Sequence, residues 1–221
     1  MNERVAAEVF TVAADASLQS VLNDPSSPPP VRRALSGIHS LQLRNETIVG
    51  RTLRASRLGP QWIAALLALG AGVTLDRDDG SQDVALDALI RKEEGGAVAA
   101  LHIPILDADS AWGEAHVART PSDMPIVAAF AVVRMDGETV QSARVALTGV
   151  WSEAVRLARA PDVLVGGPLD EERIREVAVT VEGEVEPVGD YVGSEAYRRA
   201  MAGVVTRRAL KACLEQEEAD E

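Results

Sequence analysis

The chain has 221 residues, 47% of them hydrophobic and 25% charged, which is ordinary for a soluble globular protein of one domain or two small ones. Its net charge of −12 at pH 7 argues against a nucleic-acid partner, and an aromatic content of 3% argues against a base-stacking surface. One cysteine, Cys213, excludes an intrachain disulfide, and no apolar stretch reaches the roughly 20 residues of a membrane helix. We therefore expect a cytoplasmic protein without a membrane span.

The N-terminal part is predicted to form two helices. "DASLQSVLND" is typical of a short helix that Asp15 caps. The segment "PSSPPP" then breaks the chain, and a second helix is expected to begin near Pro30 or Val31, where the fixed backbone of proline is tolerated. The expected apolar faces are Leu18, Val21 and Leu22 in the first helix, and Val31, Leu35 and Ile38 in the second.

The segment "RNETIVGRTLRASRLGPQ", residues 44–61, is predicted as a strand and turn with Gly50 at its centre. It carries Arg51, Arg54 and Arg57 and raises the question of a ligand loop. The next segment, "WIAALLALGAG", is typical of a buried helix that ends at Gly70 or Gly72.

The middle of the chain changes to the period of strands. "VTLDRDDGSQDVALDAL" predicts a strand, a polar turn and a second strand, and "AVAALHIPI" predicts a third. "IVAAFAVVRMDGETVQSARVALTGV" is typical of a hairpin that turns at Asp136 and Gly137. The segment "PILDADSAW" interrupts the pattern, so we place a division of the chain between residues 104 and 112.

Two helices are predicted at the C-terminal end. Asp170 is expected to cap the first, and Ser194 the second. Arg198, Arg199, Arg207 and Arg208 are expected to lie largely off the apolar stripe of the last helix, and residues 216–221 to form a solvated acidic tail. The predicted apolar faces are Ile174, Val177, Ala178 and Val181, followed by Tyr197, Met201, Val205, Ala209 and Ala212.

Known catalytic motifs are absent from the sequence. His39, His102 and His116 are far apart, so a metal site built from them would require tertiary approach, and ordinary hydrogen-bonded histidines are the simpler interpretation. Cys213 falls on a helical stripe and is expected to be buried and inert. No GxSxG, GxGxxG or P-loop pattern occurs, so no catalytic or metal-binding residue is assigned.

The segment "GDYVGSEAYRRAMAGVVTRRALKAC" resembles the C-terminal signature of the flavin-binding subunits of molybdenum hydroxylases, a family that includes the medium subunit of aerobic carbon monoxide dehydrogenase and the flavin domain of xanthine dehydrogenase. The hairpin, with Arg119 and Asp123 before it, and the segment "PLDEERI" are also similar to the family. The resemblance implies an α+β fold: a remnant of the second FAD-binding subdomain (1–106), then an antiparallel sheet with C-terminal helices (107–215), then the acidic tail.

The same resemblance implies that the first FAD-binding subdomain, with its pyrophosphate-binding glycine loop, is missing; a genuinely short protein and a truncated one remain alternatives. It also aligns residues 44–61 with the second flavin loop of the family. The remnant of a cofactor-binding site would then consist of Asn45, Thr47, Gly50 and Thr52. Arg51 stands where the family has a glycine, although the arginines of this loop are also suited to a phosphate-bearing ligand.

The expected function is a flavin-subunit homologue that has lost FAD binding on its own and acts as a structural or partner-binding subunit. The alternative is a functional FAD-binding oxidoreductase subunit, which passes electrons from a molybdenum and iron–sulfur partner and whose site another chain completes. Expected partners are a second copy or the large and iron–sulfur subunits. Without the first subdomain, we expect exposed apolar surface on the helix "WIAALLALG" and its sheet.

Overall fold

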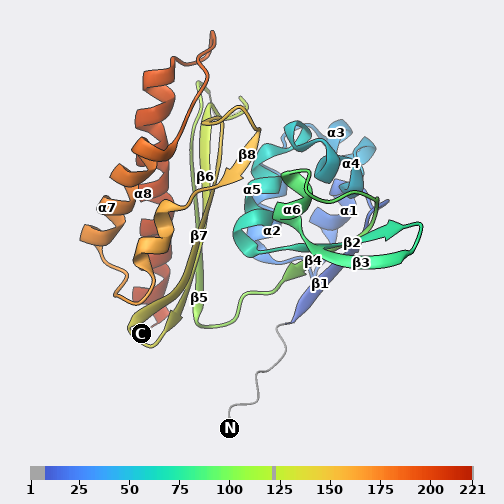
Figure 1. The fold of residues 1–221 in the computed structure, drawn as a ribbon, viewed down its shortest axis with the longest axis horizontal. Coiled ribbons are helices and arrows are strands. Elements are labelled where there is room, and N and C mark those ends of the chain that lie inside the picture. Colours follow the sequence, from blue (N-terminus) through green and yellow to red (C-terminus); the bar gives the residue numbers. More distant parts are fainter. Residues whose placement is uncertain (1–7, 121–122, 221) are drawn as a thin grey trace.

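The computed structural model describes residues 8–120 and 123–220 and has the α+β fold expected from the sequence (Figure 1). Two antiparallel sheets of four strands form its framework. The first has the order β1-β4-β2-β3, and the second β5-β6-β7-β8. The strands are β1 (Val9–Ala13), β2 (Gly72–Arg77), β3 (Gly80–Ala85), β4 (Ala97–Pro104), β5 (Ser110–Val117), β6 (Val127–Asp136), β7 (Thr139–Thr148) and β8 (Val155–Leu157).

The helices are divided between the two sheets. Those that accompany the first sheet are α1 (Leu18–Asn23), α2 (Pro29–Ser36), α3 (Leu41–Glu46), α4 (Val49–Arg54), η1 (Ser56–Leu58), α5 (Pro60–Leu69) and α6 (Leu86–Ile90). Those that follow the second sheet are η2 (Ala160–Leu164), α7 (Glu171–Glu184) and α8 (Glu195–Asp220). None of the helices in the described part of the chain combines the length and apolar character needed to cross a bilayer.

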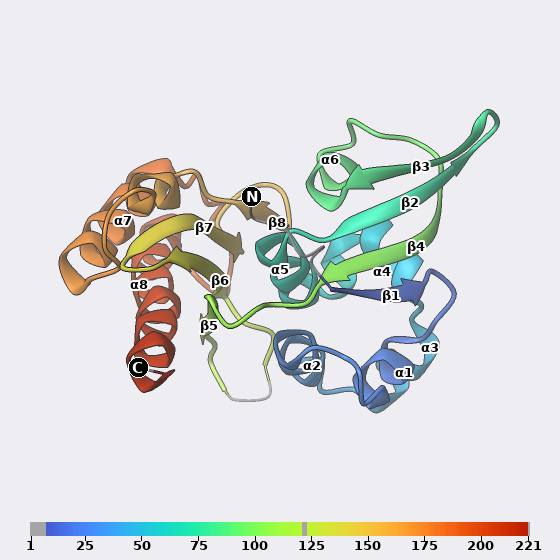
Figure 2. The same cartoon turned by 90° about the horizontal axis from the view of Figure 1, so that it is seen from below.

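Helix α5 joins the two halves of the molecule. In Figure 2 it lies between the two sheets, and every residue from Trp62 to Leu69 is buried. The first hydrophobic core contains α5 together with Phe130, Val132 and Ala146 of the second sheet. The expectation that this helix presents exposed apolar surface is therefore wrong, because the second sheet covers it. Gly70 ends the helix in the left-handed conformation, with φ of 74°.

The second sheet is covered on both faces. Helices α7 and α8 lie on the side opposite α5 (Figure 1), and the second hydrophobic core joins them to β6 and β7. Residues 127–133 of β6 are consequently buried without interruption, which is why this run is apolar at every position instead of alternating. The predicted hairpin is confirmed, with Gly137 at φ of 58° in its turn.

Several local predictions are corrected by the structure. Ser17, and not Asp15, caps α1, because its side chain accepts from the Ser20 N–H. Residues 44–61 contain α3, α4 and η1 and no strand. Ser40 caps α3 by accepting from the Leu43 N–H at 3.1 Å, so capping outweighs the strand-like composition of the segment. Arg198 is buried rather than off the apolar stripe, and α8 continues through Asp220.

Candidate functional site

The four residues predicted as a remnant flavin loop differ widely in exposure. Asn45 lies on the surface at the end of α3, and Gly50 is half-buried in the first turn of α4. Thr47 and Thr52 are buried, with 3% and 0% exposure. The structure therefore does not bring the four side chains together on one accessible surface.

Thr47 and Gly50 connect this segment to the N-terminal part of the chain. The Thr47 carbonyl accepts from the Leu18 N–H at 3.0 Å, and the Gly50 N–H donates to the Ala14 carbonyl at 2.8 Å. A Cβ placed on Gly50 would lie 3.1 Å from the Cβ of Ala14 and 3.2 Å from its carbonyl oxygen. The close backbone approach at Gly50 is thus made to the protein's own chain.

Thr52 anchors α4 to α5. Its hydroxyl donates to the Val49 carbonyl at 2.7 Å and accepts from the indole N–H of Trp62 at 3.1 Å. Both groups are fully buried, so the threonine supplies the partner that the indole N–H needs in the core.

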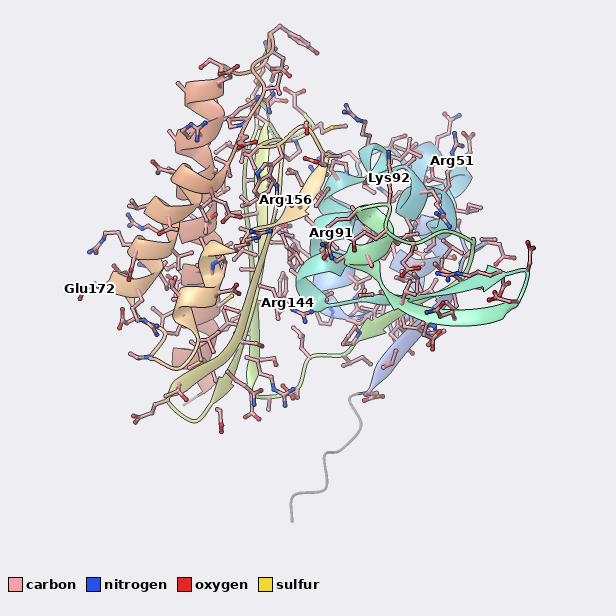
Figure 3. All side chains as sticks on the ribbon, viewed as in Figure 1. Arg51, Arg91, Lys92, Arg144, Arg156 and Glu172 are labelled. Atoms are coloured by element: carbon pink, nitrogen blue, oxygen red, sulfur yellow. The ribbon has the colours of Figure 1, made fainter. Side chains whose placement is uncertain are left out.

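Three of the four arginines in residues 44–61 are exposed to solvent. Arg51, Arg54 and Arg57 are all exposed, and within the described residues none of their guanidinium groups has a hydrogen-bond or ion-pair partner. In Figure 3, Arg51 lies at the outer end of the N-terminal half, away from the second sheet. Arg44, in contrast, donates through Nε to Gln19 Oε1 at 2.7 Å and through Nη1 to the Ile38 carbonyl.

A cleft of about 880 Å³ lies next to this segment, and sequence reasoning did not predict it. Four separate stretches form its walls, so no single motif marks it. Its lining includes Arg57 and Pro60, Arg119, residues 123–126, residues 148–149 and 151–154, residues 188–192, and Arg198. Arg119 and Asp123, which take part in the family resemblance, therefore line the same cleft as Arg57.

Arg198 holds three walls of the cleft together. Its Nη1 donates to the carbonyls of Ile126 and Gly149 at 2.8 and 2.9 Å. Its Nη2 donates to both carboxylate oxygens of Asp190, at 2.9 and 2.8 Å. The side chain is 9% exposed, so this buried charge is neutralised within the protein and is not available to a ligand.

Two carboxylates of the cleft have lowered pKa values. The hydrogen bond from Arg198 lowers the pKa of Asp190 below its usual 3.8, and the backbone N–H groups of Gly193 and Val192 add to the effect. Hydrogen bonds from its own backbone N–H and from the Ser152 hydroxyl lower the pKa of Glu153. Both groups are therefore ionised at neutral pH and are unsuited to act as general acids.

The histidines do not form a metal site in the described residues, where no group of three or more potential ligands is arranged to hold an ion. His102 lies on the first sheet, with Nδ1 3.1 Å from the Thr11 hydroxyl and Nε2 2.7 Å from the Thr74 hydroxyl. The expectation of a hydrogen-bonded histidine is thus confirmed for this residue. Cys213 is fully buried on α8, as expected, with its Sγ 3.4 Å from the Ala209 carbonyl.

Comparison with known proteins finds one matching family model and several relatives. Residues 115–213 match the model of the CO dehydrogenase flavoprotein C-terminal domain. The glyceraldehyde dehydrogenase medium chain of Sulfolobus acidocaldarius is 24% identical over 192 residues, which are 84% of this chain and 68% of the relative. The carbon monoxide dehydrogenase medium chain of Hydrogenophaga pseudoflava is 26% identical over 190 residues, which are 83% of this chain and 66% of the relative.

Solved structures of similar proteins share the fold of this chain. Carbon monoxide dehydrogenase from Hydrogenophaga pseudoflava, in a form that lacks the Mo-pyranopterin moiety, superposes with a TM-score of 0.82 at 23% identity, over 96% of this chain and 77% of that one. Quinoline 2-oxidoreductase from Pseudomonas putida 86 gives 0.81 at 25% identity, also over 96% and 77%. The chain thus spans about two thirds of the length of the curated relatives. Residues 115–213 thus match the CO dehydrogenase flavoprotein C-terminal domain, and the chain as a whole is similar to carbon monoxide dehydrogenase medium chains.

Proposed function

We propose that this chain is a medium-subunit homologue that does not bind FAD by itself and acts as a structural or partner-binding subunit. Its partners would be the large and iron–sulfur subunits of a molybdenum hydroxylase, or a second copy. We also propose that residues 1–106 are a partial FAD-binding subdomain and residues 107–215 the C-terminal domain of the family. The loop 105–109 between β4 and β5 supports that division.

The observation that carries the proposal is the internal use of the flavin-loop groups. The Thr52 hydroxyl already accepts from Trp62 and donates to Val49, so it has no further donor to offer a ligand. The close contact at Gly50 is occupied by Ala14. Among the four predicted binding residues, only Asn45 presents an exposed polar side chain. This arrangement does not fit a loop that wraps a cofactor.

The residue next to Gly50 adds to the argument. Arg51 stands at a position where the family resemblance implies glycine, and a long side chain there prevents close backbone approach. The glycine loop that would orient backbone N–H groups toward the pyrophosphate has no counterpart in this sequence. Losing two such contacts, at roughly 1.5–3 kcal/mol each, would weaken binding by about a hundredfold or more.

The alternative is an FAD site that another chain completes. The exposure of Asn45, Arg51 and Arg57 favours it, because these groups remain accessible to a ligand held from outside. In that case FAD would bind the assembled complex and not the isolated chain.

The test is an FAD titration of the purified chain, followed by flavin fluorescence. We expect no binding at micromolar concentrations, either for the wild type or for Arg51→Gly; Arg54→Gly, which changes a neighbouring exposed arginine, is the matched control. Tight binding by the wild-type chain would contradict the proposal. Tight binding by Arg51→Gly alone would show that one side chain blocks an otherwise competent loop. Binding that appears only when partner subunits are added would support the alternative.

A further inference from the structure

Three large apolar side chains that are exposed to solvent line one cavity, the cleft described above. Met124 is 68% exposed, Val188 is 64% exposed and Tyr191 is 93% exposed, and the buried Trp151 lines the same cleft. Single apolar residues are common on protein surfaces, but several around one groove are typical of an interaction site. Aromatic residues and methionine are also enriched where proteins meet each other.

Tyr191 lies on a turn whose backbone is fixed by several hydrogen bonds. The Asp190 N–H donates to the Gly193 carbonyl at 3.0 Å. The Asp190 carboxylate accepts from the N–H groups of Val192 and Gly193, at 2.9 and 3.0 Å, and from the buried Arg198. In Figure 1 this turn lies between α7 and α8 and projects beyond the start of α8. An exposed aromatic residue whose backbone is ordered beforehand loses less entropy when a partner docks.

The exposed charges that line the cleft are of both signs and in equal number. Arg57 and Arg119 supply positive charge, and Asp123 and Glu153 supply negative charge. All four side chains are exposed, and within the described residues none of them takes part in an ion pair. Such a surface can pair its arginines with the carboxylates of an identical surface, whereas a purely acidic or purely basic partner would meet like charges.

We infer that the cleft is an interface between two copies of this chain, in which Tyr191 of each copy enters the cleft of the other. The groove and the projecting aromatic residue lie next to each other on one surface, so a two-fold axis beside the turn can bring each Tyr191 to the partner's cleft. Each cleft is then completed by a side chain of the second copy. The inference rests on the proposed partner-binding role and names the second copy as the partner.

The first experiment places the photo-reactive residue p-benzoylphenylalanine at Tyr191 of the full chain and mixes this protein with heavy-isotope-labelled wild type before irradiation. Mass spectrometry then separates adducts between two copies from adducts within one copy, because only the unlabelled copy carries the photo-reactive residue. We expect adducts with labelled peptides that line the cleft, such as the one that contains Met124. Val179, which is 66% exposed on α7, is the matched control position.

The second experiment measures the oligomeric state by light scattering over a range of concentrations. We expect a dimer for the wild type. Tyr191→Ser should raise its Kd about thirtyfold or more, which is the effect of removing an aromatic residue that dominates an interface. Arg57→Glu/Arg119→Glu should also weaken the dimer, because the cleft would then carry only acids at its exposed charged positions. Arg207→Glu/Arg208→Glu on α8 adds the same charge away from the cleft and should leave the Kd unchanged.

Three results would overturn the inference: a wild-type chain that stays monomeric, adducts between copies that do not exceed the level at position 179, or a dimer that neither Tyr191→Ser nor the Arg57 and Arg119 reversal weakens. The FAD titration fails or succeeds independently. A monomer that does not bind FAD would remove only the interface between copies. A dimer that binds FAD tightly would remove the proposed loss of flavin binding and keep the interface.

Discussion

Replacing Arg198 with methionine should destabilise the protein much more than the same change at its neighbour Arg199. Both residues lie on α8. Arg198 donates to three backbone carbonyls, those of Ile126, Gly149 and Gly193, whereas Arg199 donates to two. Arg198 is buried, and its loss leaves the carbonyls of Ile126 and Gly149 without their donor. At roughly 1.5–3 kcal/mol for each bond from a charged donor, the expected loss is about 3 kcal/mol or more. Arg199 is exposed, and water can replace it, so about 1 kcal/mol is expected there.

Urea unfolding measures both variants, and the comparison requires unchanged slopes against denaturant. An equal decrease in the free energy of unfolding in the two variants would refute the reasoning, because it would show that the burial of Arg198 does not increase the stabilisation by its hydrogen bonds. The pH dependence gives a second readout. The folded-state pKa of Asp190 is lowered, so the stability that this carboxylate contributes is complete above its usual value of 3.8 and is lost as pH falls through the folded pKa. In Arg198→Met this acid-dependent loss should shrink.

Gly149→Ala should lower the free energy of unfolding in urea more than Gly137→Ala, because both glycines have positive φ but only at Gly149 would the new Cβ meet a backbone oxygen, at 2.1 Å. A similar decrease in the two variants would contradict this reasoning. Thr52→Val should cost about 1–3 kcal/mol by leaving the Trp62 indole N–H without an acceptor, while leaving the FAD titration unchanged; a gain in FAD binding would be the contrary result. Cys213 should react with a thiol reagent only at the rate of unfolding, because it is fully buried; rapid labelling of the native protein would show that α8 opens locally.

Elements with a strong period were predictable from the sequence. The hairpin β6–β7, the buried helix α5 and the cap of α7 at Asp170 all follow local rules, and the structure has them where expected. Strands β1, β5 and β8 were not predicted individually. Strand β8 has only three residues and is paired to β7 alone, so its tertiary partner, and not its own pattern, determines it.

The segment 44–61 shows why a local pattern can mislead. An isolated glycine among Thr, Ile and Val resembles a strand, but the serine cap at Ser40 and the bond from Leu18 to Thr47 favour two short helices. The prediction that Arg198 lies off the apolar stripe of α8 is wrong because that stripe was expected to begin one residue too early, at Tyr197, which is 41% exposed. The cleft was missed because its walls come from stretches that are far apart in the chain, so only the fold assembles them.

The double coverage of the second sheet limits how the chain can be dissected. A fragment that begins after Pro104 would retain α7 and α8 but would expose the face of β6 and β7 that α5 covers, including Phe130 and Ala146. A fragment that ends there would leave α5 open along the same contact. The two sheets are therefore separate in hydrogen bonding, but the first hydrophobic core contains residues of both. We expect heat or denaturant to unfold them in one cooperative transition rather than as two independent units.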